Sequence, residues 1–325
     1  MTKPLVSIII PVYNTGKYIQ RCCESLFCQT LDNLEFVFVN DGSTDDSVNT
    51  IRECLGNFPS RVPQAKIIDR AENRGISYSR QEGLDNATGE FVIHCDSDDW
   101  VELDMYQTLY NIAIKESADI VCCGFYNNYP DAQTQSSYPK TDFFQPLEFN
   151  ISPLTGSLCN KLVKRSILVD NKIHFPLDTN WGEDFCVSIE GLISASYIVC
   201  IRASFYHYRQ NLSSTTHNLT IAKCQELIRV GYHVEKFLDE TGKRSEYNFQ
   251  LNYLKFQLKA PLLMFSECRS LQLWKNVYGE TKGSFFKYNC PFYLRLTAWL
   301  IDNGMSFCAS IVLFVRDIVS KIKNS

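Results

Sequence analysis

Apolar residues follow two alternating patterns along the first 125 residues. Short continuous apolar runs occupy residues 6–10, 34–39, 66–68, 91–94 and 120–123. The segments between them repeat their apolar positions with helical spacing, at residues 18–27, 46–55, 76–87 and 103–115. Apolar strands that alternate with amphipathic helices are typical of a mainly parallel sheet covered by helices on both faces. The pattern predicts an α/β fold with a Rossmann-like sheet.

The pattern changes after about residue 215. Residues 221–238 and 247–265 have apolar positions at helical spacing and carry no chemical motif. We therefore expect a first domain at residues 1–215 and a helical C-terminal region at residues 216–325.

The predicted strands are followed by polar residues. In a parallel sheet, ligands bind beyond the carboxyl ends of the strands, here residues 11–14, 40–43, 70–75 and 96–99. Asp96, Asp98 and Asp99 place three carboxylates directly after one strand. Mg²⁺ or Mn²⁺, which prefer oxygen ligands, would relieve the repulsion among them. The alternative is a solvated acidic turn that caps the helix beginning near Glu102.

Composition narrows the function classes. No GxGxxG or Walker loop follows the first strand, so a nucleotide bound here would need a cation to screen its phosphates. A net charge of −4 argues against nucleic acid as the main partner. The 14 cysteines form no CxxC pair and no secretion signal is evident, so we expect reduced thiols in a cytoplasmic protein. No apolar run reaches the roughly 18 residues of a spanning helix.

Four motifs occur in a characteristic order. They are SIIIPVYN at residues 7–14, NDGSTD at 40–45, NRG at 73–75 with Ser79-Arg80, and DSDD at 96–99. This series resembles family-two glycosyltransferases, which are bacterial, inverting, nucleotide-sugar-dependent enzymes of the GT-A fold. Gln81 departs from the pattern, because the family often has Asn there. The resemblance implies a nucleotide-sugar-binding half at residues 1–125 and an acceptor half at 126–215.

The resemblance also implies a nucleotide site and a metal site. Its nucleotide-binding residues would be Pro11, Tyr13, Asn14, Asp41, Arg80, Asp96, Asp98, His207 and Arg209. Tyr13 would pack on uracil and Asp41 would accept its N3–H, whereas core packing and an Asx-turn are the structural alternatives. Asp98 and Asp99 would hold Mn²⁺ or Mg²⁺, and Arg80 could instead form a buried structural pair.

A Glu-Asp pair precedes the helical pattern at residues 185–193. By resemblance, Asp184 is the catalytic base that deprotonates the acceptor hydroxyl, and Glu183 contacts the acceptor or supports the structure. Burial would raise the pKa of such a base, whereas a helix N-terminus would lower it. Simple helix capping is the alternative.

Two further segments resemble family features. Residues 156–166 resemble the segment beneath the acceptor site, and we assign Asn160, Lys161 and Trp181 to the acceptor side. Lys161 either pairs with an active-site carboxylate or is solvated. Residues 206–215 resemble a loop that closes over the diphosphate. His207 and Arg209 alternate along one strand and can face the same oxygens, although a packed polar role for His207 is the alternative.

Residues 285–325 mix aromatic with basic side chains. Such a mixture is typical of an amphipathic helix that lies in the membrane plane. A terminal helix docked on the domain and a homodimer contact are the alternatives.

Together these observations predict a metal-dependent, inverting hexosyl- or N-acetylhexosaminyl-transferase. It would move a sugar from a UDP-sugar to a growing, lipid-linked saccharide of a surface polysaccharide such as a capsule. We expect it in the cytoplasm or on the inner face of the cell membrane. A sugar-nucleotidyltransferase is disfavoured because the loop after the first strand is not Gly-rich. A non-catalytic nucleotide-sugar-binding module remains the third interpretation.

Overall fold

The structure is a computed structural model that describes residues 3–130, 134–137, 156–210 and 219–324. The chain divides into two compact units, the first ending by Leu212 and the second containing the C-terminal helices. Each unit has its own set of buried apolar residues.

The first unit is built on a nine-stranded sheet with the order β3-β2-β1-β4-β8-β6-β9-β5, and β7 pairs with β6. Its strands are β1 (Val6–Val12), β2 (Leu34–Asn40), β3 (Ala65–Asp69), β4 (Phe91–His94), β5 (Trp100–Val101), β6 (Ile120–Asn128), β7 (Gln135–Ser137), β8 (Lys161–Lys164) and β9 (Ile198–Arg209). Strands β1 to β4 pair in parallel, whereas β8 runs antiparallel between β4 and β6.

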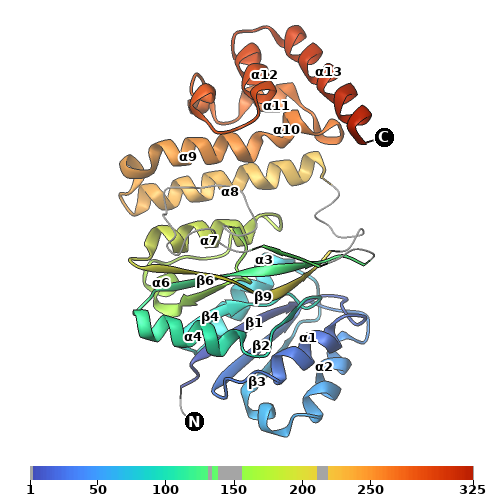
Figure 1. Cartoon of the computed structure of the whole chain (residues 1–325), viewed down its shortest axis with the longest axis vertical. Coiled ribbons are helices and arrows are strands. Elements are labelled where there is room, and N and C mark those ends of the chain that lie inside the picture. Colours follow the sequence, from blue (N-terminus) through green and yellow to red (C-terminus); the bar gives the residue numbers. More distant parts are fainter. Residues whose placement is uncertain (1–2, 131–133, 138–155, 211–218, 325) are drawn as a thin grey trace. The chain divides into compact units, whose positions relative to one another are not determined.

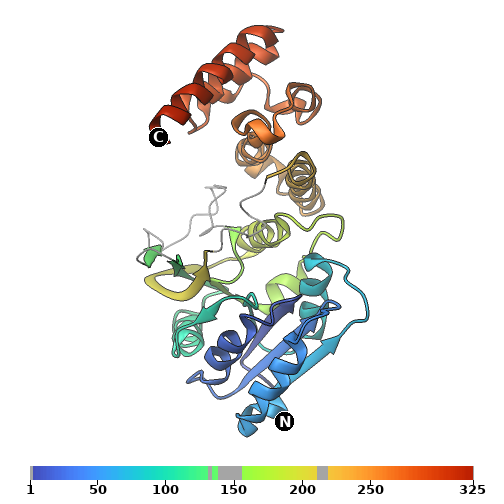
Figure 2. The ribbon, with the colours of Figure 1, turned by 90° about the vertical axis from the view of Figure 1, so that its right-hand side faces the viewer.

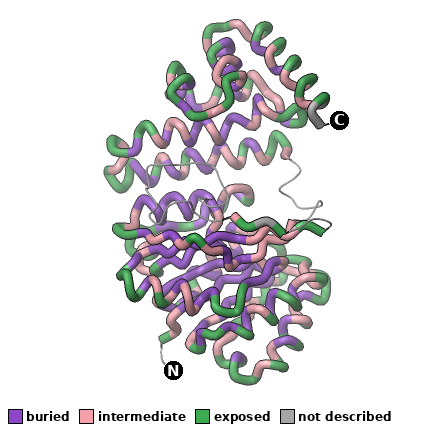
Figure 3. The backbone as a smooth tube through the Cα atoms, viewed as in Figure 1, coloured by how far each residue is buried: buried purple, intermediate pink, exposed green. Residues whose placement is uncertain are grey.

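Helices cover both faces of this sheet (Figure 1). They are α1 (Ile19–Phe27), α2 (Ser47–Gly56), α3 (Ile76–Asn86), α4 (Met105–Glu116), α6 (Arg165–Asp170) and α7 (Glu183–Ser194). Ile8 and Ile10 of β1 pack in one core cluster with Cys22 and Leu26 of α1. Ile9 points to the other face, where α3 approaches so closely that a Cβ on Gly83 would lie 2.3 Å from its Cγ2. The predicted α/β class is confirmed, because near-continuous burial of β1 requires cover on both faces (Figure 3).

The second unit is helical, as Figure 2 shows in its orange and red segments. Its α-helices are α8 (Ile221–Glu240), α9 (Arg244–Lys259), α10 (Pro261–Met264), α11 (Leu271–Asn276), α12 (Phe292–Asp302) and α13 (Ser306–Asn324). The continuous helix predicted at residues 247–265 is interrupted, since α9 ends at Lys259 and Pro261 starts α10. Proline has no N–H to continue the helical ladder. No helix of the described residues is both long and apolar enough to cross a membrane.

Candidate active site

Asp41 anchors the loop that follows β3. Its carboxylate is buried, and it accepts hydrogen bonds from the backbone N–H groups of Arg74 (2.9 Å) and Gly75 (2.8 Å) and from Arg70 Nη1 (3.0 Å). Gly75 has φ of +96°, and a Cβ there would lie 2.3 Å from the Asn180 side-chain oxygen. Asp41 is therefore more than an Asx-turn residue, and a uracil N3–H would have to use a remaining lone pair. Sequence reasoning missed this contact because the partners are 33 and 34 residues away.

The loop after β1 presents an aromatic ring to solvent. Tyr13 is 49% exposed, which excludes the core-packing alternative and leaves its ring available to stack on a base. Asn14 has φ of 51°, and its Oδ1 accepts a hydrogen bond from the Thr44 backbone N–H at 2.9 Å. Asn14 thus ties the loop after β1 to the loop after β2. Pro11 is buried within β1 opposite Val39.

The three aspartates after β4 have different surroundings. Asp98 is half-buried, and burial together with the neighbouring Asp96 raises its pKa to about 6. Asp99 is buried, and its two oxygens accept hydrogen bonds from the Tyr206 hydroxyl (2.6 Å) and the Arg209 backbone N–H (2.7 Å). Burial also raises the pKa of Asp99. The cluster is therefore not the fully solvated turn of the alternative interpretation.

The carboxylates after β4 offer few ligands for a metal ion. Among the described residues, no group of three or more His, Cys, Asp or Glu side chains is placed to hold an ion. Mg²⁺ often takes only one or two carboxylates and completes its shell with waters and substrate phosphates. Asp98 fits such a site, because burial and the neighbouring Asp96 both disfavour its negative charge, and a cation would stabilise that charge. Asp99 is turned inward, so its role as a metal ligand stays a prediction without support from these contacts.

Arg80 of α3 joins the end of β4 to the start of α7. The guanidinium is buried, its Nη1 donates to Glu183 Oε1 at 2.5 Å, and its Nη2 donates to Asp96 Oδ1 at 2.8 Å. The thiol of Cys159 lies 3.6 Å from the other Asp96 oxygen. Both oxygens of Asp96 thus have protein partners. Arg80 therefore forms buried ion pairs, as the structural alternative predicted. Its contact with the nucleotide stays a prediction.

The predicted base lies in the first turn of α7. Asp184 is half-buried, and its Oδ1 accepts a hydrogen bond from the Phe185 backbone N–H at 2.7 Å. Burial raises the pKa of Asp184 although Arg80 opposes the shift. Burial also raises the pKa of the adjacent Glu183, again against Arg80. Raised carboxyl pKa values are what general-base chemistry near neutral pH requires.

The predicted acceptor-side residues are mostly buried. Lys161 is not solvated, because its Nζ is buried and donates to the Ser157 carbonyl (2.6 Å) and to Asn160 Oδ1 (3.0 Å). Burial lowers the pKa of Lys161, and the charge of Asp184 opposes this. Asn160 in turn donates to the Cys123 carbonyl at 2.8 Å. Trp181 is half-buried two residues before Glu183.

His207 and Arg209 make different contacts, although both lie on β9. The His207 ring stacks on Trp100 and Tyr126, with centroids 4.9 and 4.6 Å away, and its Nε2 lies 2.8 Å from Glu102 Oε1. The phosphate role of His207 stays a prediction, and these contacts favour packing. Arg209 donates from Nε to the Asp98 carbonyl at 3.0 Å, which places a cation beside the carboxylate cluster.

Arg21 contributes to this region although the sequence did not point to it. Arg21 of α1 was not predicted, and its guanidinium lies 3.4 Å from the Trp100 ring centroid. Burial and the nearby Arg209 lower the pKa of Arg21. No motif could have identified a lone Arg on an amphipathic helix. Residues 211–215 of the predicted closing loop lie outside the described residues.

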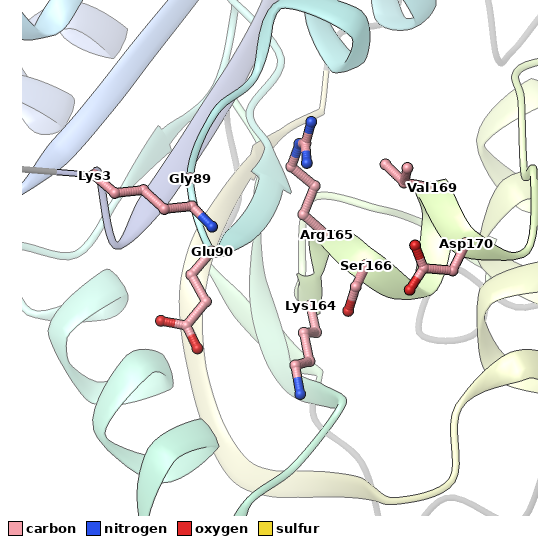
Figure 4. A pocket seen from close by; sticks show the side chains of 8 residues that line it. All are labelled: Lys3, Gly89, Glu90, Lys164, Arg165, Ser166, Val169 and Asp170. Carbon is pink, nitrogen blue, oxygen red and sulfur yellow. The ribbon is translucent and has the colours of Figure 1, made fainter.

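A cavity of about 210 Å³ lies elsewhere on the first unit (Figure 4). Its lining includes Lys3, Gly89, Glu90 and Arg165. Gly89 and Glu90 directly precede β4, so this cavity is at the amino end of the strand, whereas Asp96 and Asp98 follow its carboxyl end. It contains none of the predicted site residues.

This arrangement of strands, carboxylates and helices is that of a GT-A fold. Similar folds occur in solved structures of TarS from S. aureus, residues 1–349, with a TM-score of 0.69, 18% identity and coverage of 96% of this chain and 91% of that one. The same TarS segment in complex with UDP-GlcNAc has a TM-score of 0.68 at 16% identity and the same coverage. A mannosyltransferase from Pyrobaculum calidifontis, in complex with GDP-Man and Mn²⁺, has a TM-score of 0.53 at 16% identity, covering 99% of this chain and 89% of that one.

Sequence comparison shows to which family the chain belongs. The model of glycosyl transferase family 2 matches residues 7–170. The putative glycosyltransferase EpsH of Bacillus subtilis is 32% identical over 263 residues, which are 78% of this chain and 74% of EpsH. The uncharacterized glycosyltransferase EpsJ of the same organism is 27% identical over 82% of this chain and 79% of its own length. The chain belongs to glycosyl transferase family 2, which confirms the resemblance seen in its motifs.

Proposed function

We propose that this protein is a metal-dependent, inverting glycosyltransferase that uses a UDP-sugar donor. It transfers a hexosyl or N-acetylhexosaminyl group to a growing, lipid-linked saccharide of a surface polysaccharide such as a capsule. Residues 1–125 form the donor half, residues 126–215 the acceptor half, and residues 216–325 a helical region. The single observation that carries the proposal is the Arg80 bridge, which joins Asp96, in the carboxylate cluster after β4, to Glu183, the residue before Asp184.

The bridge matters because inverting transfer needs two groups on opposite sides of one anomeric carbon. The donor diphosphate leaves on the Asp98 side, and the acceptor hydroxyl attacks from the Asp184 side. A divalent cation bound beside Asp98 would neutralise charge that develops on the leaving diphosphate. Asp184, with its raised pKa, takes the proton of the acceptor hydroxyl.

The donor is assigned from the recognition chemistry. Tyr13 and Asp41 follow neighbouring strands. The exposed Tyr13 ring suits the face of uracil, and the buried Asp41 carboxylate suits its N3–H edge. Arg209 beside Asp98 suits the diphosphate. The solved TarS complexes with UDP and UDP-GlcNAc support the same donor class for this chain.

The test is nucleotide release from a panel of UDP- and GDP-sugars, with and without Mn²⁺ or Mg²⁺. We expect release from a UDP-sugar to require metal and to be lost in Asp98→Asn. The matched control is Asp104→Asn, which changes an exposed Asp six positions further along. Metal-independent release, or equal loss in both variants, would contradict the assignment of Asp98.

The cellular setting follows from the acceptor. A lipid-linked saccharide is presented at a membrane surface, and we place the enzyme on the cytoplasmic face of the cell membrane as a peripheral protein.

A further inference from the structure

Helix α13 has an apolar face that its own unit leaves uncovered. Among the residues of α13 whose burial is described, Ala309 and Leu313 are buried and form the packing side. Its exposed large apolar residues are Phe307, Ile311, Phe314, Val315, Ile318, Val319 and Ile322. Their spacing of three and four places them on one side of the helix. Phe307 is 79% exposed and Phe314 is 64% exposed.

Arg316 and Asp317 of α13 fix this orientation. Arg316 Nη1 donates to the Met264 carbonyl at 2.6 Å and to Asp317 Oδ1 at 3.0 Å. Arg269 donates to both oxygens of Asp317, at 2.8 and 3.1 Å. These bonds hold Arg316 and Asp317 against the unit, and the exposed apolar residues lie on the other side of the helix. This is the reverse of a surface helix in an ordinary globular protein.

The apolar surface continues toward α12. A groove of about 420 Å³ is lined by Tyr293, Ile311, Val312, Val315, Arg316 and Val319. On α12 itself, Phe292 and Trp299 are also exposed. Aromatic side chains beside an apolar surface are typical of the boundary between headgroups and acyl chains. An exposed apolar surface of this kind marks an interaction site.

The net charge of the helical unit indicates what kind of partner the apolar surface binds. Residues 219–325 contain fifteen Lys and Arg against nine Asp and Glu, whereas residues 1–218 contain 17 against 27. The helical unit is therefore positive in a chain whose net charge is −4. A positive unit with an exposed apolar helix suits an anionic lipid surface. Pairing α13 with α13 of a second copy would bring two positive units together, which electrostatics opposes.

We propose that α13 docks in the plane of a bilayer that contains anionic lipid, with its outward face inserted among the headgroups. The inference rests on the peripheral location proposed above, and it does not depend on which sugar is transferred. Its failure would be seen in vesicle binding, whereas failure of the proposed function would be seen in nucleotide release in solution.

The experiment measures binding of the full-length protein to vesicles of phosphatidylcholine, with or without phosphatidylglycerol. We expect sedimentation with the anionic vesicles, reduced by added salt because the Debye length shortens. Phe314→Ser with Ile318→Ser should weaken binding about 30-fold, or about 2 kcal/mol. Ile114→Ser is the control, because Ile114 of α4 is 49% exposed and Ile318 is 44% exposed, and it should leave binding unchanged.

Three results would overturn the proposal. One is a full-length protein that stays in solution with anionic vesicles at low salt. Another is equal weakening by the control variant. The third is a dimer of the wild type that light scattering shows to become a monomer in the double variant, which would make α13 an interface between copies. If the double variant does not fold, Phe307→Ser alone, at the most exposed of these residues, provides the same comparison.

Discussion

Replacing Arg80 by Met tests whether the bridge between Asp96 and Glu183 holds the first unit together. Met keeps much of the side-chain length and removes the guanidinium. The change leaves Glu183 without its 2.5 Å partner and Asp96 without its 2.8 Å partner. Removing one partner of a buried ion pair costs about 3–5 kcal/mol, because the remaining charge is buried and uncompensated. For a unit of roughly 200 residues this corresponds to a fall in Tm of about 6 to 20 °C.

The loss should depend on pH. In the wild type, burial raises the pKa of Glu183 and Arg80 opposes the shift. Without Arg80, the folded-state pKa of Glu183 rises further above its unfolded value. A carboxyl with a raised folded pKa destabilises the fold at high pH, and the penalty disappears as the pH falls toward the unfolded pKa. In the wild type the pKa of Glu183 is raised to about 8. The difference in stability between wild type and variant should therefore grow as the pH passes through that value, and be larger near pH 9 than near pH 6.

Urea unfolding followed by tryptophan fluorescence at both pH values measures this difference. Arg52→Met is the matched control, because Arg52 and Asp69 form an ion pair at 3.5 Å with both side chains largely exposed, and its loss should cost at most about 1 kcal/mol. Arg80→Met with Glu183→Gln should be less damaging than the sum of the single changes. A loss below about 1 kcal/mol at pH 9, or a loss independent of pH, would refute the bridge.

Three further predictions concern the site and its support. Asp184→Asn should lower turnover by about 10² to 10⁴ and leave the Kd for UDP unchanged in calorimetry. The kcat of the wild type should rise with pH through the raised pKa of Asp184, because the base must be unprotonated. A pH-independent kcat would count against Asp184 as the base. Arg209→Ala should weaken UDP more than uridine, whereas equal losses would indicate a folding role. Gly83→Val should destabilise the first unit by about 1–3 kcal/mol, because its Cβ meets Ile9, and an unchanged urea midpoint would show that α3 can shift.

The sequence by itself determined the elements of the donor half and the place of its site. Continuous apolar runs such as residues 34–39 can be buried only as central strands, and the polar residues after them fall at one edge of the sheet. The order of four motifs then identified the family. These signals are local in the sequence, so they can be recognised without the tertiary structure.

Only the tertiary structure decided which partner each polar side chain has. Arg80 and Glu183 are 103 residues apart, and Asp99 meets Tyr206 across 107. Short motifs cannot encode such distances, so Asp98 and Asp99 looked equivalent until folding turned one of them inward. The same holds for α13, because its composition shows an amphipathic helix but not the side that faces its own unit. That side is set by the bonds of Arg316 and Asp317 to residues about 50 positions earlier.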